Sequence, residues 1–237
     1  MTLIDKNFNG NISEALQNSI VTPTLLLIDK EKEWTSFDVI ARLRKMINIK
    51  KIGHAGTLDP LATGLLLLGV GKGTKLLTEL TGMDKTYIGT IKFGATTDSD
   101  DSEKEEENIK NTSELEFEKL DLLKNNFIGE IQQKPPRFSA KKIKGKKMYQ
   151  MARKGIDFEV KSVTVSINEF ELLNFNSPFC DFKIACSKGT YIRSIARDLG
   201  ELSGYGGYLS ELRRTLIDKY SVENAFKLSE LNEILEL

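Results

Sequence analysis

A short, wholly apolar segment at residues 65–70 (LLLLGV) is the feature that most constrains the fold. Gly64 and Gly71 bound the segment on either side. A continuous apolar run between turn residues is typical of a strand that is buried on both faces. At 237 residues the chain is long enough to bury a substantial core around such a strand. The sequence therefore predicts a sheet whose central strand includes this run.

Strand and helix patterns are intermixed along the rest of the chain. Alternation predicts strands at residues 24–28, at 85–94 and over most of 158–187. Helical spacing and capping residues predict helices at 36–48 with Ser36 as the cap, 74–81 closed by Gly82, 114–126, 146–154 and 190–202. Residues 51–60 are expected to form a loop, and residues 1–20 a loosely attached extension. Without regular βαβ spacing, this order predicts an α+β fold with a mixed, mainly antiparallel sheet flanked by helices and loops.

The charge is balanced overall but unevenly distributed. Lys plus Arg and Asp plus Glu each number 34, which weighs mildly against a nucleic-acid ligand. Residues 134–154, however, carry nine lysines and arginines and no acid, while residues 98–107 are almost wholly acidic. The acidic segment is expected to be a solvated loop, and the basic one is a candidate surface for an anionic partner.

Several classes of protein are disfavoured by what the sequence lacks. No stretch approaches the ~18 unbroken apolar residues of a membrane span, and the first twenty residues lack a secretory pattern. Cys180 and Cys186 alternate with Phe182 and Ile184, so we expect two buried thiols on a strand. His54 is the only histidine, which excludes a His-rich zinc site. A reducing, cytoplasmic setting is predicted, and no metal chemistry.

Two charged residues are candidates for chemistry. Asp59 precedes Pro60, which favours an extended or turn backbone that presents the carboxylate, although Asp-Pro alone signals only a turn. Arg193 is expected in the first helical turn after an N-cap at Thr190, where a cation is disfavoured by about 0.3–1 kcal/mol. A carboxylate partner would explain that arginine, and solvent exposure would explain it equally well. If the partner is Asp59, the pair would hold the carboxylate ionised and aimed, as a nucleophile requires.

The segment around Asp59 carries a family resemblance. Residues 51–64 (KIGHAGTLDPLATG) closely resemble the signature of the TruB family of tRNA pseudouridine-55 synthases. Further segments match in order: residues 84–87 (DKTY), 135–153 (PPRFSAK to AR), 186–193 (CSKGTYIR), and 212–214 (LRR) followed by Lys219 and Tyr220. The similarity runs from about Thr24 to Tyr220. It implies the pseudouridine synthase fold and the isomerisation of a uridine in the T-arm of tRNA, without a cofactor or metal.

The resemblance also implies a role for individual residues. Asp59 matches the catalytic nucleophile, Arg193 the arginine that pairs with it, and Tyr87 the tyrosine that stacks on the flipped uracil and assists proton removal. His54 matches the histidine that fills the space left in the T-loop, or it is a loop residue with a structural hydrogen bond. The remaining matches are expected to line the uracil pocket or contact RNA: Tyr191, Leu212, Lys75, Lys51, Arg137 and Lys141.

Domain boundaries follow from the same resemblance. Residues 21–237 are expected to form the catalytic domain, with an RNA-clamping insertion at about 134–155 and no C-terminal PUA domain. Two positions depart from the family pattern: residues 30–33 read Lys-Glu-Lys-Glu where Lys-Pro-x-Gly is usual, and Phe138 replaces a tyrosine. A monomer that needs no protein partner is expected. The alternatives are a tRNA-folding chaperone, whose activity would survive loss of Asp59, a synthase for a uridine at another RNA position, and, more remotely, a small-molecule enzyme.

Overall fold

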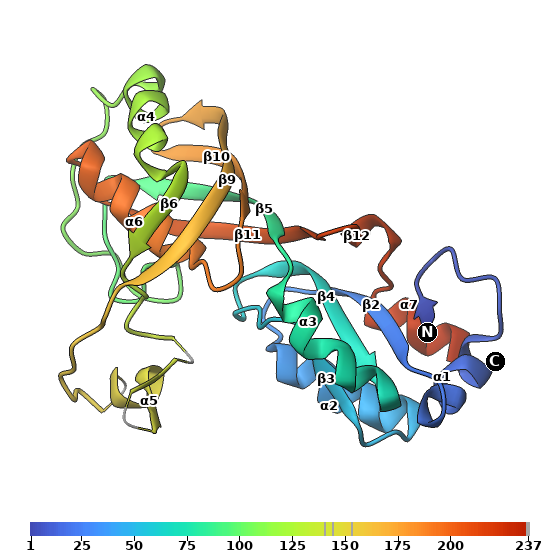
Figure 1. The fold of residues 1–237 in the computed structure, drawn as a ribbon. Helices are drawn as coiled ribbons and strands as arrows, with labels where there is room; N and C mark the ends of the chain where they lie inside the picture. The colour runs from blue at the N-terminus through green and yellow to red at the C-terminus, as the bar shows by residue number, and fades with distance from the viewer. Residues whose placement is uncertain (140, 144, 153, 236–237) are drawn as a thin grey trace. The chain divides into compact units, whose positions relative to one another are not determined.

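The chain folds into two compact units (Figure 1). The structure is a computed structural model that describes residues 1–139, 141–143, 145–152 and 154–235. The first unit comprises Met1–Tyr87 and Leu212–Leu237, and the second comprises Ile88–Glu211. Strands β5 (Lys85–Phe93) and β11 (Gly207–Ile217) run from one unit into the other. Among the described residues no helix is both long and apolar enough to cross a membrane.

The sheet of the first unit is built around β4 (Thr63–Val70), which contains the apolar run. β2 (Thr24–Lys30) pairs with β4 in antiparallel register, from Thr24 opposite Val70 to Lys30 opposite Gly64. The other strands are β1 (Thr2–Ile4) beside β2, β3 (Ile52–His54) beside the end of β4, and β12 (Tyr220–Ser221) beside β11. The side chains of Leu65, Leu66, Leu67 and Leu68 are 0% exposed, so the predicted buried strand is confirmed.

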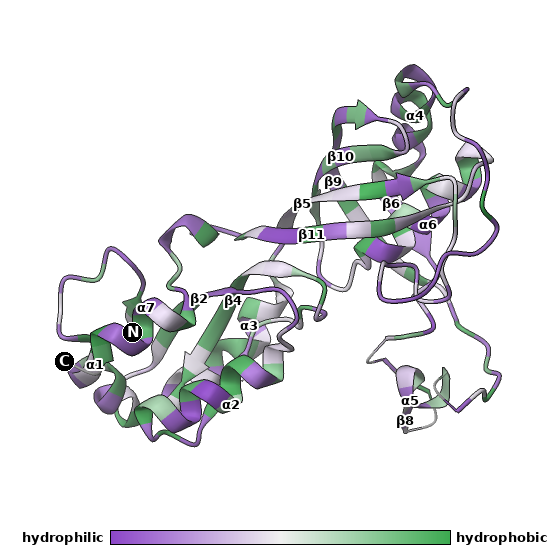
Figure 2. Cartoon of the chain, turned by 180° about the vertical axis from the view of Figure 1, so that it is seen from behind, coloured by the Kyte–Doolittle hydropathy of each residue, from purple (hydrophilic) through white to green (hydrophobic). Residues whose placement is uncertain are grey.

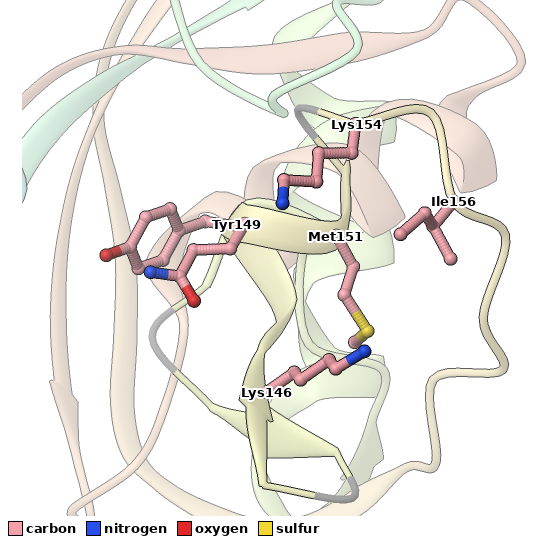
Figure 3. Close-up of a pocket in the computed structure, with 6 residues that line it drawn as sticks. Lys146, Tyr149, Met151, Lys154 and Ile156 are labelled. Carbon is pink, nitrogen blue, oxygen red and sulfur yellow. The ribbon is translucent and has the colours of Figure 1, made fainter.

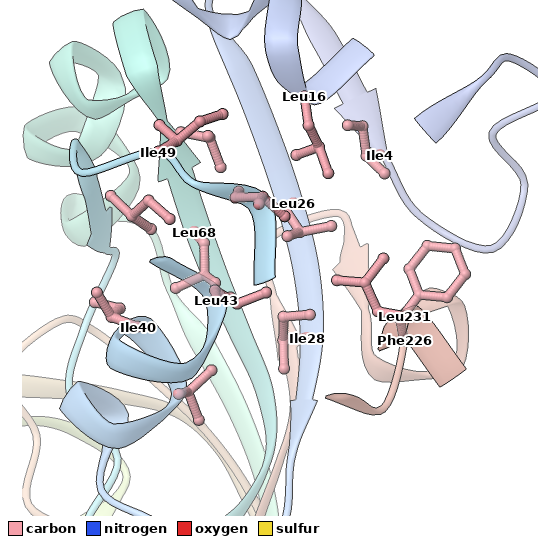
Figure 4. Close-up of a cluster of buried hydrophobic side chains, with 14 of the residues drawn as sticks. Ile4, Leu16, Leu26, Ile28, Ile40, Leu43, Ile49, Leu68, Phe226 and Leu231 are labelled. Atoms are coloured by element: carbon pink, nitrogen blue, oxygen red, sulfur yellow. The ribbon is translucent and has the colours of Figure 1, made fainter. Parts of the chain in front are cut away.

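Helices cover both faces of this sheet, which is why residues 65–70 of β4 are apolar without alternation. Alternate residues Leu26, Ile28, Leu66 and Leu68 face α1 (Ile12–Gln17), α2 (Ser36–Ile47) and α7 (Leu228–Leu235) (Figure 4). The intervening leucines 25, 27, 65 and 67 face the side of α3 (Leu77–Gly82), which follows the 3-10 helix η2 (Gly71–Leu76). In Figure 2, α2 alternates between hydrophilic and hydrophobic positions, as a helix with one buried face must.

Three local predictions for the first unit are wrong. Residues 1–20 are not a loose extension, because β1 pairs with β2, and Ile4, Ile12 and Leu16 belong to the core. The cap of α2 is Thr35, whose hydroxyl accepts from the Asp38 amide in a capping box, and not Ser36. Residues 51–60 are not all loop, since 52–54 form β3. β1 and β3 form because they pair with strands that lie elsewhere in the sequence. The cap of α2 lies one residue before the predicted cap.

The second unit contains an antiparallel arrangement of β6 (Gly129–Gln133), β9 (Val163–Asn176) and β10 (Phe179–Cys186), against which α4 (Phe117–Leu123) and α6 (Ile192–Ser203) are placed. The strands follow in the order β10-β9-β6, with β5 and β11 beyond β10. α4 continues as a 3-10 turn (Lys124–Phe127) and packs against α6 and β9. The predicted burial of Cys180 and Cys186 with Phe182 and Ile184 is confirmed. The mixed, mainly antiparallel α+β fold is likewise confirmed: β1–β2 and β4–β11 pair in parallel, whereas β2–β4, β3–β4, β6–β9, β7–β8, β9–β10 and β11–β12 pair in antiparallel direction.

The basic segment forms a small substructure of its own, drawn in yellow in Figure 1. β7 (Lys142–Ile143) and β8 (Lys146–Lys147) make a hairpin, and α5 (Met148–Ala152) follows at once. The helix predicted at 146–154 is therefore shorter and begins at Met148. Ala140, Lys144 and Arg153, which belong to the motif and the basic segment discussed above, lie outside the described residues.

Candidate active site

The loop that carries Asp59 is fixed by backbone hydrogen bonds on both sides of that residue. The buried Ser36 hydroxyl accepts from the Leu58 amide at 2.8 Å and donates to the Leu58 carbonyl at 3.1 Å. The Asp59 carbonyl accepts from the Ala62 amide at 3.1 Å, which closes the turn through Pro60. Asp59 itself is half-buried. Its carboxylate is thus presented from a backbone that is held in place, as the pre-proline position predicts.

Two buried cations lie close to this loop, and sequence reasoning assigned neither of them a role. Lys30 is 1% exposed, and its ammonium donates to the carbonyls of Glu31 at 2.9 Å and Trp34 at 2.6 Å. Burial lowers the pKa of Lys30 to about 8, and the negative charge of Asp59 opposes that lowering. Arg214, also 1% exposed, donates to the carbonyls of Leu65 at 2.8 Å and Gly56 at 3.1 Å. The loop therefore lies in a positive local field, which suits an anionic nucleophile.

The departure from Lys-Pro-x-Gly leaves the turn intact but strains it. Glu33 stands where the family has glycine, and it adopts φ 71°, the left-handed region that favours glycine. Its amide donates to the Pro60 carbonyl at 2.8 Å, and the Lys30 ammonium lies 3.5 Å from the same oxygen. The turn after β2 consequently braces the residue that follows Asp59.

β11 closes the same region of the first unit from the other side. Arg213 binds both carboxylate oxygens of Asp29, at 2.9 and 2.8 Å, and the carbonyl of the half-buried Leu212 accepts from the Thr63 hydroxyl at 3.4 Å. Gly64 lies so near β11 that an added Cβ would be 2.3 Å from the Arg214 carbonyl oxygen. A glycine is required there, which explains the Thr-Gly pair that ends the signature segment.

The other predicted site residues of the first unit lie on, or next to, β3, η2 and β5. His54 ends β3 and is half-buried; burial, and next the charge of Arg214, lower its pKa, so the ring is neutral at pH 7. Tyr87, on β5, is 8% exposed. Lys51 and Lys75 expose their side chains, and the Lys51 carbonyl accepts from the Gly71 amide at 2.8 Å, at the start of the turn that carries Lys75. The unit that contains Asp59 thus also contains a neutral imidazole, an aromatic ring and two exposed ammonium groups.

Arg193 is buried in the second unit and fully engaged. α6 begins at Ile192 with Tyr191 as its N-cap, so the predicted cap at Thr190 is wrong; the Thr190 hydroxyl donates to the Ser187 carbonyl instead. The Arg193 side chain is 7% exposed and donates to Asp101 Oδ2 and to the Ser99 carbonyl, both at 3.1 Å. The expectation of a carboxylate partner, rather than exposure, is confirmed, and within this unit the partner is Asp101.

The acidic loop is only partly solvated, which corrects the prediction for residues 98–107. Asp101 is 1% exposed, and its other oxygen accepts from the Ser99 hydroxyl at 2.5 Å. Asp100 pairs with Arg197 at 2.9 Å; burial raises its pKa to about 6 against the attraction of that arginine. Residues 102–107 are exposed as predicted. Burial of two adjacent aspartates could not be inferred without knowing that α6 supplies their arginines.

Tyr191 and the insertion complete the predicted set. Tyr191 is half-buried, and its amide and carbonyl bind the side-chain amide of the buried Gln133, at 2.8 and 3.1 Å. Arg137 is exposed and pairs with Asp157 at 3.3 Å, while Lys141 is half-buried and its carbonyl accepts from the Met148 amide at 2.8 Å. The insertion holds a cavity of about 580 Å³ (Figure 3), lined by Lys146, Tyr149, Gln150, Met151, Lys154 and Ile156.

The chain matches two models of known protein families. Residues 44–192 match the model of the TruB family pseudouridylate synthase N-terminal domain. The chain belongs to the TruB family. Residues 193–237 match the model of the tRNA pseudouridylate synthase B C-terminal domain. The resemblance read from the motifs is therefore confirmed.

Full-length relatives agree with that membership. The chain is 48% identical over 213 residues to tRNA pseudouridine synthase B of Chloroherpeton thalassium, covering 88% of each chain. It is 45% identical over 235 residues to the protein of that name from Protochlamydia amoebophila, covering 95% of this chain and 88% of the relative. A crystal structure of a Cbf5-Nop10-Gar1 complex contains a chain with TM-score 0.72 and 25% identity; the match covers 92% of this chain but only 56% of that one.

The predicted site residues of this TruB-family chain divide between the two units. Six belong to the first unit: Asp59, Tyr87, His54, Leu212, Lys75 and Lys51. Four belong to the second: Arg193, Tyr191, Arg137 and Lys141. Pairing of Asp59 with Arg193, which joins residues of different units, stays a prediction. The residues that sequence reasoning missed, Ser36, Lys30, Arg214, Asp101, Arg197 and Gln133, share one property: each is a buried or half-buried polar group that holds backbone or another charge.

Proposed function

We propose that the protein converts the uridine at position 55, in the T-loop of tRNA, to pseudouridine, with the Asp59 carboxylate as nucleophile. Membership of the TruB family establishes uridine-to-pseudouridine isomerisation in tRNA. The observation that supports the role of Asp59 is its placement: a half-buried carboxylate on a doubly anchored turn, beside two buried cations that are themselves committed to backbone carbonyls.

The reaction balances without any added reagent. Uridine and pseudouridine are isomers, so the N1–C1′ bond breaks, a C5–C1′ bond forms, C5 loses one proton and N1 gains one. The carboxylate of Asp59 adds to the ribose or to the base and is released again at the end, which splits one difficult step into easier ones. Because no atom is gained or lost, the site has to retain the detached uracil and move one proton.

Other residues are assigned to binding the flipped uracil and to pairing with the negative charge of Asp59. Taking the nucleotide out of the folded loop costs a few kcal/mol of unstacking. Stacking on an aromatic ring returns about 1–3 kcal/mol per base, and Tyr87 supplies such a ring. We assign Arg193 as the charge partner of Asp59, Tyr191 and Leu212 to the uracil pocket, and the neutral His54 to the space that the flipped base leaves.

The insertion and the exposed lysines are suited to RNA. Lys51, Lys75 and Arg137 present cations at the surface, and Lys141 is half-buried at the root of the insertion hairpin. The insertion cavity combines two lysines, an aromatic ring and an amide over an apolar floor. RNA recognised by shape is held largely through phosphate and 2′-hydroxyl contacts, so this composition supports contact with the T-arm.

The test is position-mapped pseudouridine formation in an unmodified tRNA transcript. The wild type should modify the T-loop uridine, and a transcript with cytidine at that position should yield no product. Asp59→Asn should abolish product while leaving the tRNA dissociation constant within about threefold, because the side chain keeps its size. Ser102→Ala, in the exposed acidic loop, is the matched control and should be unaffected.

Each contrary outcome overturns a different part. Wild-type product at another uridine would refute the T-loop assignment, and full activity of Asp59→Asn would refute the nucleophile. Tight tRNA binding with no product at any position would point to an RNA-folding role instead.

We infer further that the protein acts as a monomer in the cytoplasm without a protein partner; a mass above 26.6 kDa by light scattering of the active enzyme would contradict the monomer.

A further inference from the structure

Two arginines on α6 form parallel ion pairs with two consecutive aspartates. Arg193 and Arg197 are four residues apart and so lie on one face of the helix. Arg193 binds Asp101 at 3.1 Å, and Arg197 binds Asp100 at 2.9 Å. The Asp100–Arg197 side chains are 13% and 19% exposed, so this second pair is largely shielded from water.

The same helix face also holds the start of the insertion. The Lys134 carbonyl accepts from Arg197 Nη2 at 3.0 Å and from the Ser194 hydroxyl at 2.9 Å. The Phe138 carbonyl accepts from Arg193 Nη2 at 3.0 Å. One helical turn therefore joins the root of the insertion to the loop that contains Asp100 and Asp101.

We propose that Arg197 is a positioning residue that, through Asp100 and the Lys134 carbonyl, fixes the root of the insertion and the loop that orients Arg193. The inference rests on the proposed function, in which Arg193 serves the reaction and the insertion contacts RNA. It is distinct from that function because Arg197 pairs with Asp100, Asp198 and the Lys134 carbonyl, none of which is a predicted reacting group.

The backbone of Asp100 explains why the pair is needed. Asp100 has φ 61°, a conformation that a non-glycine residue keeps only when its surroundings impose it. The restraints are the Arg197 ion pair and two backbone hydrogen bonds, from the Asp100 amide to the Thr97 carbonyl at 3.2 Å and from the Leu209 amide to the Asp100 carbonyl at 3.1 Å. Of these, only the Arg197 ion pair holds the side chain, so its removal should loosen Asp100 and with it Asp101, the next residue.

Proton binding to Asp100 supplies an independent readout. Burial raises the pKa of Asp100 to about 6, and the charges that face it are Arg197 and Arg193, which oppose the rise, and Asp198, which adds to it. As pH falls through 6, Asp100 loses its charge and its ion pair. Wild type and Asp100→Asn should therefore converge at pH 5.5 and differ at pH 7.5, which a residue with only a packing role would not produce.

The experiment measures three quantities on the full-length protein: the tRNA dissociation constant, the single-turnover rate with enzyme in excess, and the rate of trypsin cleavage between residues 134 and 154. The variants are Arg197→Ala, Arg197→Lys and Asp100→Asn. Lys183→Ala is the control, because it removes an exposed ion pair with Glu169 in the same unit.

We expect Arg197→Ala to weaken binding, slow the single turnover and speed trypsin cleavage, each by roughly tenfold, the size of effect typical of a charge-assisted hydrogen bond. Arg197→Lys should fall between Arg197→Ala and wild type, because lysine restores the charge but not the fork that reaches Lys134. Lys183→Ala should match wild type in all three measurements.

The inference is overturned if Arg197→Ala and Asp100→Asn both stay within twofold of wild type at pH 7.5, or if the single-turnover rate of Asp100→Asn does not approach that of wild type as the pH falls to 5.5. Should Arg197→Ala fail to fold, Arg197→Lys and Asp100→Asn decide by the same criteria. A wild type that makes no pseudouridine at the T-loop uridine would refute the proposed function alone, because trypsin cleavage still scores the positioning role.

Discussion

Replacing Ser36 by alanine should destabilise the loop that carries Asp59 without weakening α2, the helix that begins at Ser36. Ser36 is 2% exposed, and its hydroxyl is bound to both the amide and the carbonyl of Leu58. Ser36→Ala leaves two buried backbone groups without their partner, one residue before the proposed nucleophile. The helix itself loses nothing, because alanine is the better helix former and the cap is Thr35.

The expected loss of stability follows from that count. Each of the two unsatisfied buried groups costs about 1–3 kcal/mol, and alanine returns a few tenths through helix propensity, so the free energy of unfolding should fall by about 1.5–5.5 kcal/mol. A loop released by one hydrogen-bonded pair can displace the carboxylate by about 1 Å, and displacements of that size cost up to ~10²-fold in rate. We therefore expect kcat to fall by at least about tenfold.

Urea unfolding at 25 °C measures the stability, followed by the fluorescence of Trp34, the only tryptophan, which lies two residues from Ser36. Tritium release from tRNA labelled at uridine C5 measures the isomerisation, because that bond breaks in every turnover. Thr35→Ala is the control: it removes the capping box, costs about 1 kcal/mol, and leaves Leu58 untouched. If Ser36→Ala loses under 1 kcal/mol, or if Thr35→Ala lowers kcat equally, the reasoning is refuted.

Three further predictions concern charge and strain. Glu33→Gly should stabilise the protein by about 0.5–1 kcal/mol in urea unfolding, because it relieves the left-handed conformation at φ 71°; destabilisation would contradict this. Burial lowers the pKa of Lys30 to about 8 in the folded protein, against 10.5 for an ordinary lysine. Between about pH 8 and 10.5 the unfolded chain therefore binds more protons than the folded one, and the contribution of Lys30 to stability rises with pH over that window. Lys30→Met should remove this part of the pH dependence, which unfolding at pH 7.5 and 9.5 measures against wild type. Lys154→Ala should lower the slope of log Kd against log salt for tRNA by about 0.7–1, whereas Lys183→Ala should leave it unchanged.

The sequence predicts the elements whose signal is local. The run at residues 65–70 lies in a buried strand, and the alternation around Cys180 and Cys186 places both thiols in the core, because burial on a strand depends mainly on each residue's own character. β1 could not be predicted, since three residues give no period, and their pairing is with β2, more than twenty residues away.

Motifs predict the candidate site residues, whose roles stay predictions, whereas the burial of several charged residues could not be predicted from the sequence. The resemblance of residues 51–64 assigns roles to Asp59 and His54, the separate match at residues 84–87 assigns one to Tyr87, and the structure adds their settings. Asp101 was expected to be solvated because acidic runs usually are, and only its pairing with Arg193, 92 positions away, makes burial favourable. The sequence carries no sign that Lys30 is buried, because its burial depends on three carbonyls that lie within reach of its ammonium.

The balanced net charge, which weighed against an RNA ligand, is explained by where the charges lie. Asp29, Asp100 and Asp101 neutralise arginines inside the protein and present little charge to a ligand. Among the acids of the exposed 102–107 loop, Glu106 pairs with Lys92. At physiological salt the Debye length is about 8 Å, so a phosphate senses the nearby lysines rather than the total. Equal numbers of acids and bases are therefore compatible with an RNA-binding surface when a share of the acids is paired with bases inside the protein.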